Sequence, residues 1–474
     1  MKVFDPSLLA KWTGGFWTRE PKEKIENFCF DTRKLGKNEC FLAIKNAHND
    51  GHNYVKMAEK TGAVASIVEH EIPGVLLPQL VVKNTLEAFQ NIAKYYRKTL
   101  TTKIIGVTGS CGKTSLKELL ALLLGDATFK TPENFNNHLG LPFSITQIDP
   151  EIHQNAVIEV GISYPNEMDV LLDMLQPDEA ILTNVGPAHL GNFDSINAIG
   201  IEKFKLLNGA KGNVFFLEEF QNFNHKKDHF YVLSSPQKEH SYTLTENLED
   251  DSLMYNTLSV IRSNVKYINH NGDHIFYSLC PTERGWNITV DGLDFHIPFL
   301  LGNGAIQNFV LAIAVALKNN VPQALIQKRL QYWKPFLNRG IWKRVGDRNY
   351  FIDCYNANPV SYADSLQHFY NEKPKNASTC FVLGSMEELG ANSEKYHKEI
   401  ASHIKVNSED YLICIGHFCE AIKEGLLDRG FSKNQIQCFK IAEDATNLLE
   451  CLPQNCIYLK GSHCYHLENL VAEE

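Results

Sequence analysis

The sequence predicts an α/β protein built from three domains. Its 474 residues, at about 150 residues per domain, suggest this number. A glycine-rich loop between an apolar strand and a helix, with strands and helices alternating on both sides of it, is typical of parallel sheets. We expect a small mixed α/β domain over residues 1–98, a central domain with a mainly parallel sheet and a β annex over 99–319, and a C-terminal Rossmann-like domain over 320–474.

The first of these sections mixes short strands and helices. Tyr95–Lys103 is polar and basic without a core pattern, so we expect a linker there. The other elements expected in this section are a strand at Glu39–Ile44, a helix at Asn53–Thr61 ended by Gly62, and a buried strand at Ala63–Glu69.

The central section opens with an apolar strand that runs straight into the glycine-rich loop. Later, short alternating runs over 253–300 surround Asn271-Gly272, which is a hairpin signal and predicts the antiparallel annex. The elements expected here are strands at Lys103–Val107, Ala156–Val160, Ala180–Asn184 and Asn213–Leu217, and helices at Ser115–Leu124, Ser195–Leu207 and Phe309–Leu317.

The third section alternates strands with helices and predicts a second doubly wound sheet. Its expected strands are Tyr350–Asp353, Cys380–Leu383, Tyr411–Ile415 and Ile457–Lys460, and its expected helices include Tyr362–Tyr370 and Ser393–Ile404.

Composition and charge exclude several classes of protein. The chain carries 46 basic and 55 acidic residues, a net charge of −9. Proteins that bind the phosphate backbone of nucleic acids usually carry an excess of basic residues. We therefore expect no nucleic-acid partner. Hydrophobic residues make up 44% of the chain and charged residues 21%, which excludes wholesale disorder.

The N-terminal residues and the cysteines indicate the compartment. Asp5, Pro6 and Lys11 interrupt any signal-peptide core, and the longest clear apolar run, Phe309–Leu317, is too short to span a membrane. The twelve cysteines contain no CxxC pair, so reduced thiols are favoured over a metal site. We expect a cytoplasmic protein without a membrane span.

The strongest local signal is the loop Gly109-Ser-Cys-Gly-Lys-Thr114. Glycines let backbone N–H groups approach phosphate oxygens, and the following helix presents its positive end to the same anion. Lys113 can reach the outer phosphates, and the Thr114 hydroxyl can bind Mg²⁺. The alternative is a chance Gly-Lys-Thr turn, and the flanking strand and helix favour nucleotide binding.

Three further residues are candidates with simpler alternatives. Glu159 stands among apolar residues near a strand end, where a second Mg²⁺ ligand is expected, although a plain strand-edge carboxylate would fit. Its local sequence predicts that His189 is a solvated loop histidine. The local sequence of Lys203 predicts a surface lysine.

Taken together, the motifs resemble the Mur ligase family. The resemblance rests on Thr108-Gly-Ser-Cys-Gly-Lys-Thr114, Asn134-Phe-Asn-Asn-His-Leu-Gly-Leu-Pro142, Glu159, His189-Leu-Gly-Asn-Phe193, Asp353-Cys-Tyr-Asn-Ala-Asn-Pro359 and Leu383-Gly-Ser-Met-Glu-Glu-Leu-Gly390. In the first section, Asp31-Thr-Arg33, Cys40-Phe-Leu-Ala43 and Asn49-Asp-Gly-His52 are similar to the family's UDP-binding domain.

The resemblance implies roles for individual residues. Lys113 and the backbone of Thr108, Gly109, Ser110, Cys111 and Gly112 would hold the ATP phosphates, with Asn308, Arg339 and Asp353 completing the ATP site. Thr114, Glu159, His189 and Lys203, the last as a carbamate, would bind Mg²⁺, with two ions expected. Lys113, Lys203, His189 and Glu159 would be catalytic, and Asp31, Thr32, Arg33, Asn136 and Asn137 would bind the UDP substrate.

The implied activity is ATP-dependent amide-bond formation in peptidoglycan synthesis. Within the family, the motifs are similar to members that join D-alanyl-D-alanine to UDP-N-acetylmuramoyl-tripeptide through an acyl phosphate. The alternatives are a ligase of this fold that adds a single amino acid, a folate ligase, and a scaffold that binds ATP without ligation. The first section argues against a folate enzyme, which lacks such a UDP-binding domain. We expect a monomer.

Overall fold

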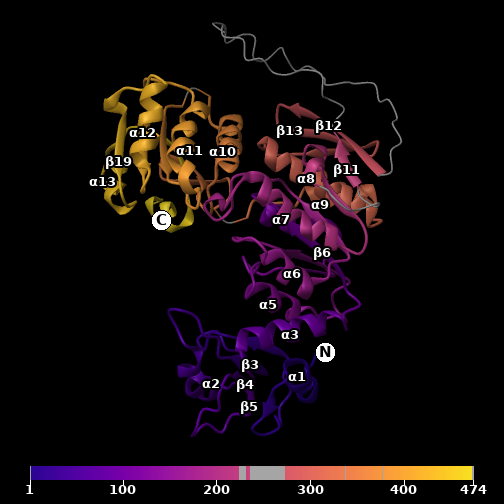
Figure 1. The fold of residues 1–474 in the computed structure, drawn as a ribbon. Helices are drawn as coiled ribbons and strands as arrows, with labels where there is room; N and C mark the ends of the chain where they lie inside the picture. Colours follow the sequence, from indigo (N-terminus) through magenta and orange to yellow (C-terminus); the bar gives the residue numbers. More distant parts are fainter. Residues whose placement is uncertain (1, 224–230, 235–272, 337, 376, 472–474) are drawn as a thin grey trace.

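The computed structural model describes residues 2–223, 231–234, 273–336, 338–375 and 377–471. Three sheet-containing regions follow one another along the chain, as the sequence predicts. Figure 1 shows the N-terminal region in indigo at one end, the central region in the middle, and the C-terminal region in orange and yellow beside the central one.

The N-terminal region is a five-stranded sheet with order β1-β5-β4-β3-β2, parallel except for β1. A Pro at the start of α1 and the Asp5 side chain cap that helix, and Asn84 caps α3 through the backbone N–H of Glu87. The elements are α1 (Pro6–Thr13), β1 (Phe16–Trp17), β2 (Asn27–Cys29), β3 (Glu39–Leu42), α2 (Val55–Thr61), β4 (Ala65–Val68), β5 (Gln79–Val81) and α3 (Thr85–Arg97).

The predicted linker at Tyr95–Lys103 is wrong in its first part, because α3 continues to Arg97. The Tyr96 hydroxyl donates to the Ile148 carbonyl at 2.6 Å, and Arg97 Nε donates to the Leu175 carbonyl at 2.9 Å. Both side chains are buried against the central region. Arg97 is therefore part of the contact between the two regions, because its guanidinium donates hydrogen bonds to carbonyls at the end of a helix.

The central region is a nine-stranded sheet with order β14-β13-β12-β11-β10-β9-β6-β8-β7. Seven neighbouring strands of this sheet are parallel: β12, β11, β10, β9, β6, β8 and β7. The strands β12, β13 and β14 form an antiparallel meander. The strands are β6 (Lys103–Thr108), β7 (Thr128–Lys130), β8 (Asn155–Glu159), β9 (Glu179–Leu182), β10 (Val214–Leu217), β11 (Tyr231–Ser234), β12 (Asp273–Thr282), β13 (Gly285–Val290) and β14 (Leu293–Ile297).

Helices cover both faces of the central sheet, so successive strand residues enter different cores. Ile104 packs in the core that α3 also enters, whereas Ile105 and Val107 pack against α4 and α8 on the opposite face. This two-sided burial explains the continuous apolar runs in the sequence. The helices are α4 (Lys113–Leu124), α5 (Gly140–Gln147), α6 (Glu167–Leu175), α7 (Ile196–Gly209), α8 (Asn303–Lys318) and α9 (Gln323–Leu330).

The C-terminal region is a six-stranded sheet with order β15-β16-β20-β17-β18-β19, antiparallel only at β15. One face packs against α10, α11 and α12 and the other against α13 and residues 467–471. The elements are β15 (Ile341–Val345), β16 (Arg348–Asp353), α10 (Pro359–Glu372), β17 (Thr379–Gly384), α11 (Ser393–Glu399), β18 (Tyr411–Ile415), α12 (Cys419–Asp428), β19 (Ile436–Phe439), α13 (Thr446–Cys451) and β20 (Cys456–Lys460).

The remaining predicted elements agree with the structure to within a few residues, except that the helix expected at Phe309–Leu317 begins six residues earlier, at Asn303. The antiparallel annex is confirmed over β12 to β14, whereas the Asn271-Gly272 hairpin signal lies outside the described residues. None of the described helices combines the length and the apolar run that crossing a bilayer requires.

Candidate active site

The phosphate loop lies between β6 and α4, and the loop after β9 holds it in shape. Gly109 has φ of +151°, and a Cβ there would lie 1.8 Å from Thr183 Oγ1, so only glycine fits. Thr183 Oγ1 donates to the Cys111 carbonyl at 2.6 Å, and the Cys111 N–H donates to Asn184 Oδ1 at 2.9 Å. The loop is thus preorganised before any phosphate binds.

Gly112 is the N-cap residue of α4 and lies in the left-handed region, with φ of +78°. A Cβ there would lie 2.6 Å from Asn308 Nδ2, which donates to the Gly112 carbonyl at 3.3 Å. Asn308, on α8, therefore packs directly against the phosphate loop, close to where the sequence predicts it.

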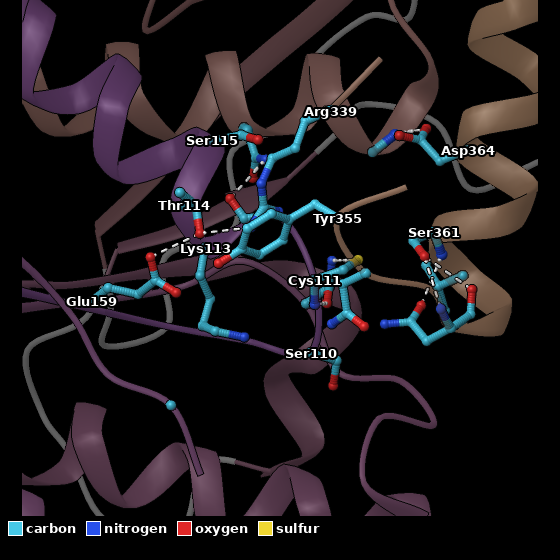
Figure 2. A pocket seen from close by; sticks show the side chains of 18 of the residues that line it. Ser110, Cys111, Lys113, Thr114, Ser115, Glu159, Arg339, Tyr355, Ser361 and Asp364 are labelled. Atoms are coloured by element: carbon cyan, nitrogen blue, oxygen red, sulfur yellow. Dashed lines mark hydrogen bonds between the residues drawn. The ribbon is translucent and has the colours of Figure 1, made fainter. Parts of the chain in front are cut away.

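Lys113 and Thr114 open α4 and point to the same side of the loop. The Lys113 ammonium donates to the Gly109 carbonyl at 2.8 Å, and burial lowers the pKa of this lysine while nearby Glu159 opposes that shift. The Thr114 hydroxyl donates to Glu159 Oε2 at 2.9 Å, and Asn136 Nδ2 donates to Glu159 Oε1 at 2.8 Å. Figure 2 shows Thr114 between Glu159 and Arg339.

Glu159 fits a site for a divalent cation. The residue is only 2% exposed at the end of β8, and among the described residues no lysine or arginine forms an ion pair with it. A buried carboxylate is costly without a cation. Together with the Thr114 hydroxyl it offers oxygen ligands of the kind that Mg²⁺ prefers.

A cavity of about 460 Å³ joins the central and C-terminal regions around these groups. Of the residues predicted from the sequence for ATP, metal and substrate, it is lined by Ser110, Cys111, Gly112, Lys113, Thr114, Asn136, Asn137, Glu159, His189, Asn308, Arg339 and Asp353. The side chains that Figure 2 labels come from both regions.

Arg339 and Asp353 are the two predicted ATP-site residues that come from the C-terminal side of the cavity. Arg339 Nη2 donates to Thr114 Oγ1 at 3.1 Å, and its guanidinium carbon lies 4.1 Å from the centre of the Tyr355 ring. The Arg339 Nε–H is buried without a hydrogen-bond acceptor among the described residues, so it is free to donate to a phosphate oxygen. Asp353 forms an ion pair with Lys460 at 3.0 Å.

His189 lines the cavity, whereas Lys203 does not. His189 follows β9, and its Nδ1 contacts the carboxylate of Glu388, which lowers the pKa of that carboxyl. Lys203, on α7, is only 1% exposed, so the simple interpretation as a surface lysine is wrong. Burial lowers its pKa well below the usual value, and repulsion from Lys113 lowers it further.

Several predicted residues lie away from the cavity. Thr108 and Gly109 form the base of the loop, and Lys203 is not among the lining residues. Asp31, Thr32 and Arg33 belong to the N-terminal region, where Asp31 and Arg33 form an ion pair at 2.8 Å. The cavity therefore collects most of the ATP and metal candidates, without Thr108, Gly109 and Lys203, and of the residues predicted at the UDP end only Asn136 and Asn137.

Sequence reasoning missed four residues that organise the cavity. Asn184 anchors the phosphate loop, Tyr355 stacks on Arg339, and Lys460 pairs with Asp353 and donates to the Asn356 carbonyl at 2.9 Å. Lys117, one helical turn after Thr114, is fully buried. The position of Lys117 one turn after Thr114 on α4 is a signal that the sequence contains. Asn184, Tyr355 and Lys460 become evident only from contacts between distant segments.

The Lys117 ammonium connects α4 to the segment that contains Thr131 and Glu133 and to the segment that contains Phe336. It donates to the carbonyls of Thr131 and Glu133 at 2.8 and 3.2 Å, and it lies 5.9 Å from the centre of the Phe336 ring. The first two residues precede Asn136, and Phe336 precedes Arg339. Lys117 is therefore a positioning residue between α4 and both of these segments.

Fold and site together define a nucleotide-dependent enzyme in which a P-loop sheet and a second doubly wound sheet share one cavity. The chain belongs to the Mur ligase family: residues 107–316 match the Mur ligase middle domain and residues 342–463 match the Mur ligase, glutamate ligase domain.

Curated relatives match almost the whole chain. The UDP-N-acetylmuramoyl-tripeptide--D-alanyl-D-alanine ligase of Bacillus subtilis (strain 168) is 29% identical over 95% of this chain and 93% of its own length. The enzyme of the same name from Haemophilus influenzae is 26% identical over 94% and 93%. Among solved structures, MurF from Acinetobacter baumannii is 25% identical, with a TM-score of 0.80 over 99% of this chain and 98% of that one.

Proposed function

We propose that this protein is an ATP-dependent ligase that joins D-alanyl-D-alanine to the terminal carboxylate of UDP-N-acetylmuramoyl-tripeptide, releasing ADP and phosphate. The observation that carries the proposal is an end-to-end match to ligases named for this reaction. The cavity supports the ATP-dependent part, because it unites a phosphate loop with Arg339 from the other sheet.

The reaction needs ATP because a carboxylate does not react with an amine at neutral pH. Transfer of the γ-phosphoryl group to the tripeptide carboxylate gives an acyl phosphate and ADP. The amine of D-alanyl-D-alanine then attacks the carbonyl carbon, a tetrahedral intermediate forms, and phosphate leaves as the amide bond closes. Water would hydrolyse the acyl phosphate, so the reaction requires an enclosed site.

The chain's own cations would stabilise the charge on the transferring group. Lys113 would exchange its hydrogen bond with the Gly109 carbonyl for one with the outer phosphates, while the amides of residues 109–114 hold the inner ones. Arg339 would donate its unpartnered Nε–H to the same anion from the opposite side. Asn308 and Asp353 are proposed to bind the adenosine part of ATP.

Thr114 and Glu159 are proposed to bind one Mg²⁺, and His189 is proposed to join Glu159 around a second, with a Lys203 carbamate as a further oxygen ligand. When bound, Mg²⁺ neutralises phosphate charge and orients the transferring group. Carbamylation requires a neutral amine, and the lowered pKa of buried Lys203 favours that form. Among the described residues, Lys203 has no hydrogen bond or ion pair that would compete with modification.

The three regions divide the substrates in our proposal. Residues 1–98 would hold the UDP end through Asp31, Thr32 and Arg33, residues 99–319 would bind ATP, and residues 320–474 would complete the ATP site and receive the dipeptide. Asn136 and Asn137 would then contact the acceptor substrate. Because the reaction consumes ATP and nucleotide-linked precursors, we propose that it runs in the cytoplasm, and that the chain acts as a monomer.

Mass spectrometry of the product tests the proposal. The protein is incubated with ATP, Mg²⁺ and D-alanyl-D-alanine, and with UDP-N-acetylmuramoyl-tripeptide that carries either diaminopimelate or lysine as its third residue. We expect the mass of one dipeptide minus water to be added to at least one tripeptide. Addition of a single amino acid would indicate another Mur-type ligase, and phosphate release without either cosubstrate would indicate a nucleotide-hydrolysing scaffold.

A further inference from the structure

Three cysteines and a glutamate gather at the outer edge of the C-terminal sheet, away from the ATP cavity. Cys438 lies on the edge strand β19 and is the direct partner of Cys414 on β18. Cys419 and Glu420 form the first turn of α12. All three cysteines belong to the core on the face that α12 covers, so their side chains share one side of the sheet.

The potential ligand atoms of this cluster lie close together. The sulfurs of Cys419 and Cys438 and a carboxylate oxygen of Glu420 lie within 4.8 Å of one another. The Cys438 thiol lies 3.5 Å from the Cys419 carbonyl oxygen. The Cys414 thiol hydrogen-bonds to Cys438, and this contact lowers the pKa of Cys438 and raises that of Cys414.

Burial gives the cluster a closed side and an open side. Cys414 is fully buried and Cys419 is 8% exposed, whereas Cys438 is half-buried and Glu420 is exposed. A small ion can therefore enter from solvent beside Glu420. The second group of closely spaced ligand residues in the described chain, His463, His466 and Glu468, has no buried member and lacks such a closed side.

We propose that Cys414, Cys419, Cys438 and Glu420 form a binding site for one thiophilic divalent cation of the Zn²⁺ class. Thiolates favour zinc over Mg²⁺ or Ca²⁺, and three sulfurs with one oxygen complete a tetrahedral set. With Zn–S bonds of about 2.3 Å, the ligand atoms of such a site lie roughly 3.8 Å apart. Cys419, Cys438 and Glu420 already lie within 4.8 Å of one another, and Cys414 joins them through its contact with Cys438.

Binding involves proton release and no redox step. Each bound cysteine gives its thiol proton to solvent as its sulfur takes the metal, so no oxidant is required. Glu420 now forms an exposed ion pair with Lys423 at 3.1 Å, which is weak enough to exchange for the metal. The cation would connect α12 to β18 and to the edge strand β19.

The cluster borders a segment that leads toward the cavity. Gly416, His417 and Phe418 lie between Cys414 and Cys419 in the sequence, and the Phe418 N–H donates to Ser385 Oγ at 3.0 Å. Ser385 begins the loop that carries Glu388, the partner of His189. A metal at the cluster would therefore stabilise the scaffold of this loop without touching substrate.

Cobalt titration tests the site in the full-length protein. The protein is freed of metal with a chelator, kept reduced without oxygen, and titrated with Co²⁺ alone. We expect saturable thiolate-to-cobalt charge-transfer absorption at one ion per chain, together with the visible bands of tetrahedral Co²⁺. Cobalt at Glu159 would show no thiolate band, so the two sites are distinguishable. Zn²⁺ should displace the Co²⁺ and raise the melting temperature.

Matched serine variants locate the signal. Cys438→Ser and Cys419→Ser should weaken Co²⁺ binding by at least about 100-fold, because each removes a thiolate ligand. Cys451→Ser and Cys464→Ser, at exposed cysteines outside the cluster, should leave it unchanged. Glu420→Gln should weaken binding but keep the charge-transfer band.

A second measurement avoids the risk that a variant misfolds. In the wild-type protein, one equivalent of Zn²⁺ should protect Cys419 and Cys438 from alkylation, as read by peptide mass spectrometry, while Cys451 stays reactive. The absence of a saturable thiolate band, an undiminished band in Cys438→Ser, or equal protection of Cys451 would each overturn the proposal.

Discussion

Arg339 and Thr114 are 225 residues apart in the sequence, yet Arg339 Nη2 donates to the Thr114 hydroxyl at 3.1 Å. Thr114 belongs to the helix that opens the phosphate site, and Arg339 precedes the first strand of the C-terminal sheet. The contact therefore connects the two regions at the point where the ATP phosphates are proposed to bind.

Arg339→Ala should lower kcat/KM for ATP by about 10- to 100-fold, because a charge-assisted hydrogen bond to a buried anion contributes about 1.5–3 kcal/mol. Arg339→Lys should restore little, since an ammonium cannot stack on Tyr355 and donate in two directions as the guanidinium does. Steady-state kinetics at varied ATP measures both variants. Arg344→Ala, at an exposed position on β15, is the control, and an equal loss there would contradict a specific role for Arg339.

Lys113→Ala should reduce kcat by about 100- to 1000-fold, through loss of charge stabilisation in the transition state. The sequence suggests an exposed side chain whose removal barely affects stability. Lys113 is instead partly buried and bonded to the Gly109 carbonyl, so we expect a small decrease in melting temperature. Phosphate-release assays and calorimetry check both outcomes. Lys328→Ala, on the exposed side of α9, should change neither, and near-normal turnover of Lys113→Ala would refute the assignment of the loop.

Lys203→Ala should lose at least about 100-fold in kcat while it still binds ATP, because a metal ligand would be lost and the phosphate loop would remain. Acetate or formate should restore part of the rate in a concentration-dependent way, by supplying the missing oxygen ligand. Lys203→Arg should be neither active nor rescued, since its charge persists. Activity is measured with and without added carboxylate.

Lys205→Ala is the matched control for Lys203, because Lys205 lies on the same helix but pairs with Asp169 at 2.6 Å near the surface. The pH adds a further test. The lowered pKa of Lys203 increases the fraction of neutral amine at a given pH, and acidification protonates the amine and reverses carbamylation. Removal of bicarbonate should therefore reduce wild-type activity more at lower pH. Full activity of Lys203→Ala without carboxylate would contradict the carbamate.

Lys117→Met should impair catalysis although Lys117 does not line the cavity. The substitution retains the length of the chain but leaves the carbonyls of Thr131 and Glu133 without their donor. We expect the free energy of unfolding to fall by about 1–3 kcal/mol for the buried acceptors left unpaired. The KM for the tripeptide substrate should rise as Asn136 moves, with partial rescue in Lys117→Arg. Urea unfolding and kinetics separate the two effects, and reduced stability with an unchanged KM would assign Lys117 a purely structural role.

Much of the candidate site could be predicted because its signals are local. The Gly-Lys-Thr loop, Glu159 at a strand end, and the Asp353 motif each lie beside a strand with a clear apolar pattern, and the carboxyl ends of parallel strands are where ligands bind. Lys203 gave no such signal, because nothing near it in the sequence distinguishes a buried lysine from an exposed one. The sequence does not show that Tyr96 and Arg97 belong to α3, because their partners, Ile148 and Leu175, belong to another region.

The sequence by itself determined the three α/β regions, the order of most strands and helices, and the phosphate loop, since these depend on periodicity and on residues within a few positions of one another. Only the tertiary structure decided which distant groups meet. Three contacts depend on how the sheets and their helices pack. They are the hydrogen bond from Arg339 to Thr114, the contact of Glu388 with His189, and the cluster of Cys438 with Cys414 and Cys419. Such contacts are set by the burial of whole faces, which no single stretch of sequence encodes.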